Sequence, residues 1–206
     1  MLPTYFIFIA AALRLSGGMA YFKATLSGRA KPNPISWLLW SITPMIAFAA
    51  ELSAGVGPSA YVTLALGLSP LLVFLAAMYK NPKLLKLDRL DVLCVLIAAL
   101  GIILWKITSH PQLAIALVIF ADISSAMPTI RKIMHSPHTE YLPTYIISAT
   151  SMVITLLAIK DFSFASLAFP LYILTINLFL IILITHRSVL IKKRKNKRKP
   201  KTKRKK

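Results

Sequence analysis

The chain is divided into long apolar segments, each close to the length that crosses a lipid bilayer. A bilayer core of about 30 Å requires roughly 20 apolar residues in a helix. The predicted transmembrane helices span residues 3–27, 34–54, 58–79, 89–108, 112–134, 141–160 and 165–186. With 57% hydrophobic and 15% charged residues in a chain of 206, the apolar surface exceeds what one soluble core could bury. We therefore predict an all-α, polytopic integral membrane protein with seven transmembrane helices.

Two other interpretations of these segments fit the sequence less well. Runs such as 92–104 and 172–184 do not alternate between apolar and polar residues, so membrane-spanning strands are not expected. The first segment carries its earliest cation, Arg14, inside the apolar run, and we therefore expect no cleaved signal peptide. Cys94 is the only cysteine, which excludes an intramolecular disulfide.

Nearly all of the net charge of +19 falls on one predicted side of the membrane. Residues 187–206 carry thirteen Lys and Arg and no acid, which leaves +6 for the rest of the chain. If the helices alternate in direction, Lys106 and Lys160 face the other side, and nine further cations share the side of the tail: Lys23, Arg29, Lys31, Lys80, Lys83, Lys86, Arg89, Arg131 and Lys132. Because Lys and Arg in short loops stay cytoplasmic, we predict a plasma-membrane protein with its N-terminus outside and its C-terminus in the cytoplasm.

The polybasic tail, residues 187–206, has no apolar periodicity. We expect it to be disordered, because like charges repel and nothing can be buried. Lys192, Lys193, Arg194 and Lys195 would lie near the membrane surface, where each cation gains about 1 kcal/mol from anionic lipid. Anionic lipid is therefore the predicted partner of the tail. Nucleic acid is the alternative, because a polycation releases counterions from phosphate.

An internal repeat organises the apolar segments. A shift of about 107 residues places the first three predicted helices over the last three, and a basic, proline-bearing joint follows the first helix of each half. The chain then divides into a first three-helix repeat (1–80), a linker helix (81–110), a second three-helix repeat (111–186) and the tail (187–206). One linker helix gives both repeats the same orientation, so we predict two parallel three-helix bundles (3+1+3), a plan typical of transporters with a substrate site at the repeat interface.

This plan resembles the PQ-loop superfamily, which includes the SWEET and SemiSWEET sugar transporters, cystinosin-like transporters and the KDEL receptor. In the second repeat, Pro128 and Thr129 and the joint at 131–140 resemble the Pro-Gln motif and its downstream turn, with Thr129 in place of glutamine. In the first repeat the motif is absent, and Tyr21 and Phe22 take the aligned places. The resemblance implies two bundles that rock about a central cavity, with these motif positions as candidates for gating.

Two ionisable residues, Arg14 and Asp122, lie well inside predicted helices. Each would cost about 2.5 to 3.5 kcal/mol at the bilayer centre, so each should face protein or water rather than lipid. The repeat offset places them at similar depths in the two halves. Three interpretations stay open: a fixed ion pair between the halves, a substrate or proton site in a shared cavity, or snorkelling of Arg14 toward the outer surface.

Other residues are candidates for solute binding or gating. Trp37 is expected at the headgroup boundary, whereas Trp40, one turn deeper, is placed to stack on a solute. Pro44 and Pro128 each remove a helix hydrogen bond and are candidate hinges.

The third helix of each predicted repeat carries a polar residue, Ser69 or Asn177. The PQ-loop resemblance implies that these two side chains reach the solute. An interhelical hydrogen bond without a solute is the alternative for Asn177, whose amide needs partners in a dry environment.

No catalytic motif or metal-ligand spacing is found in the sequence, and we expect no enzyme activity, no cofactor and no metal. The predicted function is transport of a small polar solute, sugar-like or amino-acid-like, by alternating access. Two alternatives stay open. One is a non-transporting receptor or adaptor of the same fold, and the other is a membrane scaffold whose basic tail binds anionic lipid or nucleic acid.

Overall fold

The computed structural model describes residues 2–82, 89–108 and 110–198, and these residues are almost entirely helical. The helices are α1 (Tyr5–Leu26), α2 (Pro34–Ser53), α3 (Ala60–Lys80), α4 (Arg89–Thr108), α5 (Pro111–His135), α6 (Leu142–Ala158) and α7 (Phe164–Arg198), with a short 3₁₀ helix, η2, at Pro137–Thr139. No strand occurs in the described part of the chain. The all-α prediction is therefore confirmed.

Five of the described helices are long and apolar enough to cross a membrane: α1, α2, α3, α5 and α7. Helix α6 is also apolar but has 17 residues. Large apolar side chains point outward from several helices, among them Phe8, Leu75, Phe120 and Ile182, each more than half exposed. Such a surface would be unstable in water and fits a lipid environment, so a membrane location agrees with the structure.

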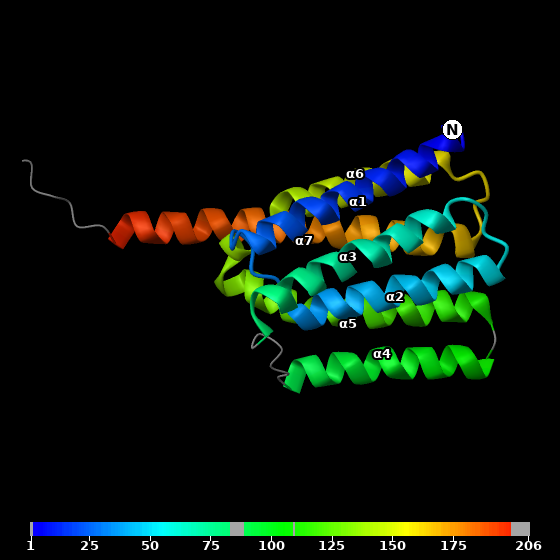
Figure 1. Ribbon diagram of the computed structural model, residues 1–206, viewed down its shortest axis with the longest axis horizontal. Helices are drawn as coiled ribbons and strands as arrows, with labels where there is room; N and C mark the ends of the chain where they lie inside the picture. The colour runs from blue at the N-terminus through cyan, green and yellow to red at the C-terminus, as the bar shows by residue number, and fades with distance from the viewer. Residues whose placement is uncertain (1, 83–88, 109, 199–206) are drawn as a thin grey trace, which may run out of the picture.

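The seven described α-helices run side by side in one bundle (Figure 1). Helix α3 packs between α1 and α2, while α7 packs against both α5 and α6. The two groups meet along α1 with α6 and along α2 with α5. Helix α4 lies at one side of the bundle, mainly against α5 (Figure 1).

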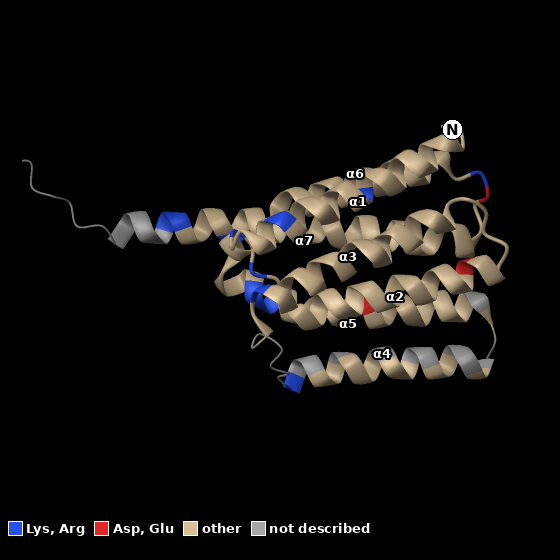
Figure 2. Ribbon diagram, in the orientation of Figure 1, with Lys and Arg blue, Asp and Glu red and all other residues tan. Residues whose placement is uncertain are grey.

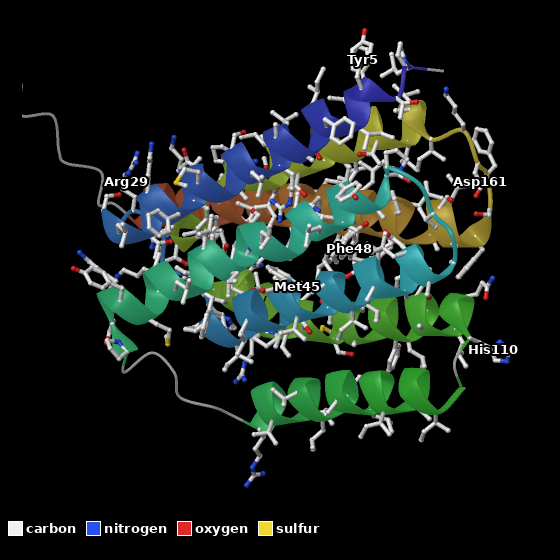
Figure 3. The ribbon with its side chains drawn as sticks, turned by 45° about the vertical axis from the view of Figure 1, so that its right-hand side comes forward. Tyr5, Arg29, Met45, Phe48, His110 and Asp161 are labelled. Atoms are coloured by element: carbon white, nitrogen blue, oxygen red, sulfur yellow. The ribbon has the colours of Figure 1, made fainter. Side chains whose placement is uncertain are left out.

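Most of the described Lys and Arg residues gather at one end of the bundle (Figure 2), here called the basic end. The α1–α2 and α5–α6 joints and the free end of α7 lie there, whereas the N-terminus and the α6–α7 joint lie at the opposite end. Arg29 and Asp161 mark these two ends in Figure 3. The side chain of Lys106 and residues Lys83 and Lys86, which entered the predicted charge bias, lie outside the described part of the chain.

Helix α7 extends beyond its predicted end at residue 186 and continues to Arg198. The expected disorder from residue 187 onward is therefore wrong for 187–198. Lys and Arg are good helix formers, and adding residues to an existing helix avoids the unfavourable nucleation step. The Arg187 side chain also donates to the Met134 carbonyl of α5 from Nε at 3.1 Å and from Nη2 at 2.5 Å.

Lys192 and Lys193 are exposed on this extension of α7, beyond the basic end of the bundle. The side chains of Arg194 and Lys195, and residues 199–206, lie outside the described part of the chain.

Two apolar clusters fill the interior of the bundle. One lies toward the N-terminal end and includes Leu66, Met152 and Phe169. The other lies toward the basic end and includes Trp37 and Leu180. Each cluster combines side chains from the two helix groups, so the two groups pack against each other at both ends of the bundle interior.

Two adjacent glycines allow α1 to approach its neighbours closely. A Cβ added at Gly17 would lie 2.9 Å from a methyl carbon of Ile147 on α6. A Cβ added at Gly18 would lie 2.0 Å from the Ser69 hydroxyl and 3.1 Å from the Ser69 Cα on α3. No side chain fits at these contacts, which is a common role of small residues between membrane helices.

Candidate functional site

A small cavity lies inside the bundle between the two apolar clusters. Six helices contribute to its lining: Arg14 from α1, Trp37, Trp40 and Pro44 from α2, Leu66 and Pro70 from α3, Asp122 from α5, Thr144, Tyr145 and Ser148 from α6, and Ile173, Ile176, Asn177 and Leu180 from α7. Its volume of about 50 Å³ is room for a few water molecules. Since polar groups from distant parts of the sequence meet here, this is the candidate binding site.

Four of the five predicted solute-binding residues line this cavity: Arg14, Trp40, Asp122 and Asn177. The fifth, Ser69, is fully buried and is not part of the lining. Its hydroxyl lies against the backbone of α1 at Gly18, so Ser69 belongs to the α1–α3 contact. The depth of Ser69 was predictable from the sequence, but the direction of its side chain depends on where α3 meets α1.

Both carboxylate oxygens of Asp122 are held by hydroxyl groups. Thr43 of α2 donates to Oδ1, and Tyr172 of α7 donates to Oδ2 at 2.6 Å. Thr43 comes from the first helix group, while Asp122 and Tyr172 come from the second. The side chain is 2% exposed, and these partners offset much of its desolvation.

Arg14 lines the same cavity but is not paired. Its side chain is 7% exposed, and neither Nε nor Nη1 has a hydrogen-bond partner. The Asp122 carboxylate is bonded to hydroxyl groups rather than to Arg14, so the fixed ion pair considered from the sequence is not formed in this structure. Burying a guanidinium with two unpartnered donor nitrogens is costly.

Trp40 and Asn177 occupy opposite helix groups in the lining. The Trp40 ring meets Trp37 edge to face at 5.5 Å between centroids. The Asn177 amide nitrogen donates to the Ile173 carbonyl of its own helix at 2.7 Å. Both residues belong to α7, so this hydrogen bond is within one helix and not the interhelical bond considered from the sequence.

The sequence predicts Trp37 at the headgroup boundary, but its side chain is buried inside the bundle. It is 1% exposed, and its ring packs against Tyr21 at 4.4 Å between centroids. Its indole Nε1 has no hydrogen-bond partner. Hydropathy placed this residue at a helix end, but the joints fold over that end and bury it.

A hydrogen-bonded network closes the bundle between the cavity and the basic end. The carboxylate of Glu140 accepts from the hydroxyls of Tyr21 at 2.8 Å and Tyr145 at 2.7 Å. Its other oxygen forms an ion pair with Lys132, which also donates to the Lys31 carbonyl at 2.5 Å. Tyr21 and Lys31 come from the first helix group, so Glu140 joins the two groups.

Sequence reasoning missed this role of Glu140. The available signal was a single acid in a joint that is otherwise basic, residues 131–140. A second missed carboxylate is Glu51, which is buried at the opposite end of the bundle and accepts from Thr63 at 3.1 Å. Neither residue stood out, because both lie near predicted helix ends where charge is ordinary.

The candidate hinge residues lie apart from one another. Pro44 lines the cavity, whereas Tyr21 belongs to the Glu140 network. Pro128 and Thr129 are buried inside α5, about two turns beyond Asp122 toward the basic end. The Thr129 hydroxyl has no hydrogen-bond partner.

The chain was compared with protein-family models, curated proteins and solved structures. No match was found in any of the three comparisons. Among the described residues, no group of three or more His, Cys, Asp and Glu is arranged to hold a metal ion.

Proposed function

We propose that this protein is a membrane transporter of the PQ-loop type, which moves a small polar solute by alternating access. The observation that carries the proposal is the meeting of Arg14, Trp40, Asp122 and Asn177 in one buried cavity. These residues come from four helices and are distributed over both halves of the chain. Buried ionisable groups inside a membrane bundle are costly and mark solute or ion pathways.

The helix contacts support two repeats of three helices with α4 as the linker. Among these six helices, exchanging α1, α2 and α3 for α5, α6 and α7 turns each major contact into another that is observed. The α1–α3 contact corresponds to α5–α7, α2–α3 to α6–α7, and α1–α6 to α5–α2. A pseudo-two-fold arrangement of this kind places a shared cavity at the interface of the repeats.

Contacts on both sides of the cavity make this structure a candidate for the occluded state. On the basic side, the Glu140 network joins the two helix groups. On the other side, Ser151 of α6 donates to the Ala10 carbonyl of α1 at 3.0 Å. A second α6–α1 hydrogen bond, from Thr144 to the Gly17 carbonyl at 2.8 Å, lies closer to the basic end. Alternating access would break the bonds of the Glu140 network that join the two helix groups and so open the basic end, while the α1–α6 contact acts as the pivot.

The basic end is proposed to face the cytoplasm, with the N-terminus outside and the protein in the plasma membrane. The described cations at this end support that orientation through the positive-inside rule (Figure 2). The tail would then bind anionic lipid on the cytoplasmic surface. Nucleic acid remains the alternative partner of the same cations.

Flux through reconstituted protein tests the transport proposal. Purified protein in liposomes should accumulate a labelled small solute in exchange for the same unlabelled solute inside. An Asn177→Leu variant should lose flux, because it removes the amide from the cavity and puts an apolar side chain of similar size in its place. A Thr175→Val variant is the matched control, since Thr175 is exposed on the same helix and bonds only its own Leu171 carbonyl.

Saturable binding without flux would contradict transport. That result would favour a receptor or adaptor of the same fold. A phenotype that is lost with the tail and unaffected by Asp122 and Asn177 substitutions would favour the scaffold alternative.

A further inference from the structure

We propose that the cavity binds a small carboxylate anion through Arg14. That the carboxylate is the transported substrate rests on the proposed function. That the cavity binds a carboxylate rests only on the hydrogen-bonding groups of its lining, so binding and transport can be tested separately.

The lining of the cavity contains donors that lack acceptors. Arg14 Nε and Nη1, Trp37 Nε1 and the Ser148 hydroxyl are all buried without a partner. Arginine and tryptophan side chains can only donate, and serine can donate as well as accept. Buried polar groups are almost always satisfied, so this set predicts a ligand rich in acceptors.

The unpartnered donor nitrogens of Arg14 favour an anion over a neutral ligand. Guanidinium groups remain protonated in proteins, and neither Nε nor Nη1 of Arg14 has a hydrogen-bond acceptor. The nearest candidate, Asp122, already accepts from Thr43 and Tyr172 through both of its oxygens. A ligand carboxylate would pair with the guanidinium and take the remaining donors, which a neutral sugar hydroxyl would do far less strongly.

The size and the remaining lining restrict the anion further. The cavity is small, about 50 Å³, so a compact anion matches it better than a monosaccharide does. Leu66, Ile173 and Ile176 provide apolar walls. A short-chain monocarboxylate, with a charged head and a small body, matches both the donors and the walls.

The route to the cavity is also favourable for an anion. Lys31, Lys80, Lys132 and His138 line a hollow at the basic end, on the far side of the Glu140 network. Clefts lined by cations raise the local concentration of anions. An anion that enters from this end would pass the closing network before it reaches Arg14.

Titration calorimetry on the full chain in lipid nanodiscs tests the site. The probes are L-lactate and pyruvate, with uncharged lactamide, glucose and inorganic phosphate as comparisons, in a chloride buffer free of carboxylates. We expect saturable binding of the two carboxylates and none of lactamide or glucose. Arg14→Gln should weaken carboxylate binding by at least about 100-fold, because charge-assisted hydrogen bonds are lost.

Matched variants separate the site from general effects. Arg187→Gln removes an arginine that bonds the Met134 carbonyl outside the cavity, and it should leave the affinity within about twofold. If Arg14→Gln does not yield a monodisperse protein, Ser148→Ala and Trp37→Phe replace it. Each removes one unpaired donor, and each should weaken carboxylate binding by about tenfold.

The outcomes distinguish the two proposals. Glucose or lactamide binding as tightly as lactate, or phosphate binding equally well, would overturn the carboxylate assignment. Flux of a neutral solute with no carboxylate binding would overturn it while leaving transport intact. Arg14-dependent carboxylate binding without labelled pyruvate flux in liposomes would instead support the site and contradict transport.

Discussion

Replacing Tyr21 with phenylalanine should make the basic end of the bundle open more readily. The Tyr21 hydroxyl donates to Glu140 Oε2 at 2.8 Å, and the two residues belong to different helix groups. Phenylalanine keeps the ring contact with Trp37, so the substitution removes mainly this hydrogen bond. A hydrogen bond to a charged group contributes about 1.5 to 3 kcal/mol.

Tyr145→Phe provides a close control for this change. Tyr145 donates to the same oxygen of Glu140 at 2.7 Å, but both residues lie in the second helix group. If the groups move as rigid bodies, opening breaks the Tyr21 bond and keeps the Tyr145 bond. Tyr21→Phe should therefore raise the open-to-closed ratio by about 10- to 150-fold, whereas Tyr145→Phe should leave the ratio unchanged.

Pulsed electron paramagnetic resonance can measure this ratio. Spin labels at Arg29 and His138, which are exposed on opposite sides of the network, report the separation of the two groups at the basic end. Cys94 is replaced by alanine to avoid labelling. Tyr21→Phe should add a population at longer distance. Equal loss of thermal stability in both variants, with unchanged distances, would refute the argument and leave the network a purely structural role.

Three further predictions concern packing, pH and the tail. Gly18→Ala should destabilise the protein by roughly 3 kcal/mol in thermal unfolding because the new methyl meets Ser69, and Ser69→Gly should recover part of the loss. The control is Gly57→Ala, because Gly57 has open space around it, and equal destabilisation by both glycine substitutions would contradict the packing. Hydrogen bonds from neighbouring serine hydroxyls lower the pKa of Asp161, just before α7. The stabilisation from these hydrogen bonds should be present above about pH 4, the ordinary pKa of Asp, and be lost as the pH falls through the lowered pKa of the folded protein. An NMR titration that gives Asp161 its ordinary pKa or a higher one would contradict this. Trypsin should cut residues 187–206 several-fold more slowly when the protein is in vesicles of anionic lipid than in zwitterionic vesicles, and the difference should be lost at 1 M salt. Equal cleavage rates would exclude anionic lipid as the partner, and protection by added RNA alone would favour nucleic acid.

Helix positions were largely predictable from the sequence. The predicted segment 89–108 coincides with α4, and 58–79 differs from α3 by two residues at one end and one at the other. This accuracy follows from the physics of membrane helices, because the length of an apolar run sets the span. The end of α7 was not predictable in this way, since charged residues can continue an existing helix outside the apolar region.

The candidate site was predictable only in part. Arg14 and Asp122 were identified because ionisable residues are unusual inside apolar segments. Trp37 and Ser69 were misplaced because the direction of a side chain depends on the neighbouring helix rather than on its own segment. Glu140 was missed for the same reason, as its partner Tyr21 lies 119 residues away.

The sequence by itself determined that the chain forms long apolar helices and that its cations gather at one end. Both properties depend on the composition of contiguous segments, which folding does not change. Only the tertiary structure decided that Asp122 is satisfied by Thr43 and Tyr172 while Nε and Nη1 of Arg14 are left without a hydrogen-bond partner. Hydrogen bonding requires contact at about 3 Å, and such contacts between helices far apart in the chain exist only once the bundle has packed.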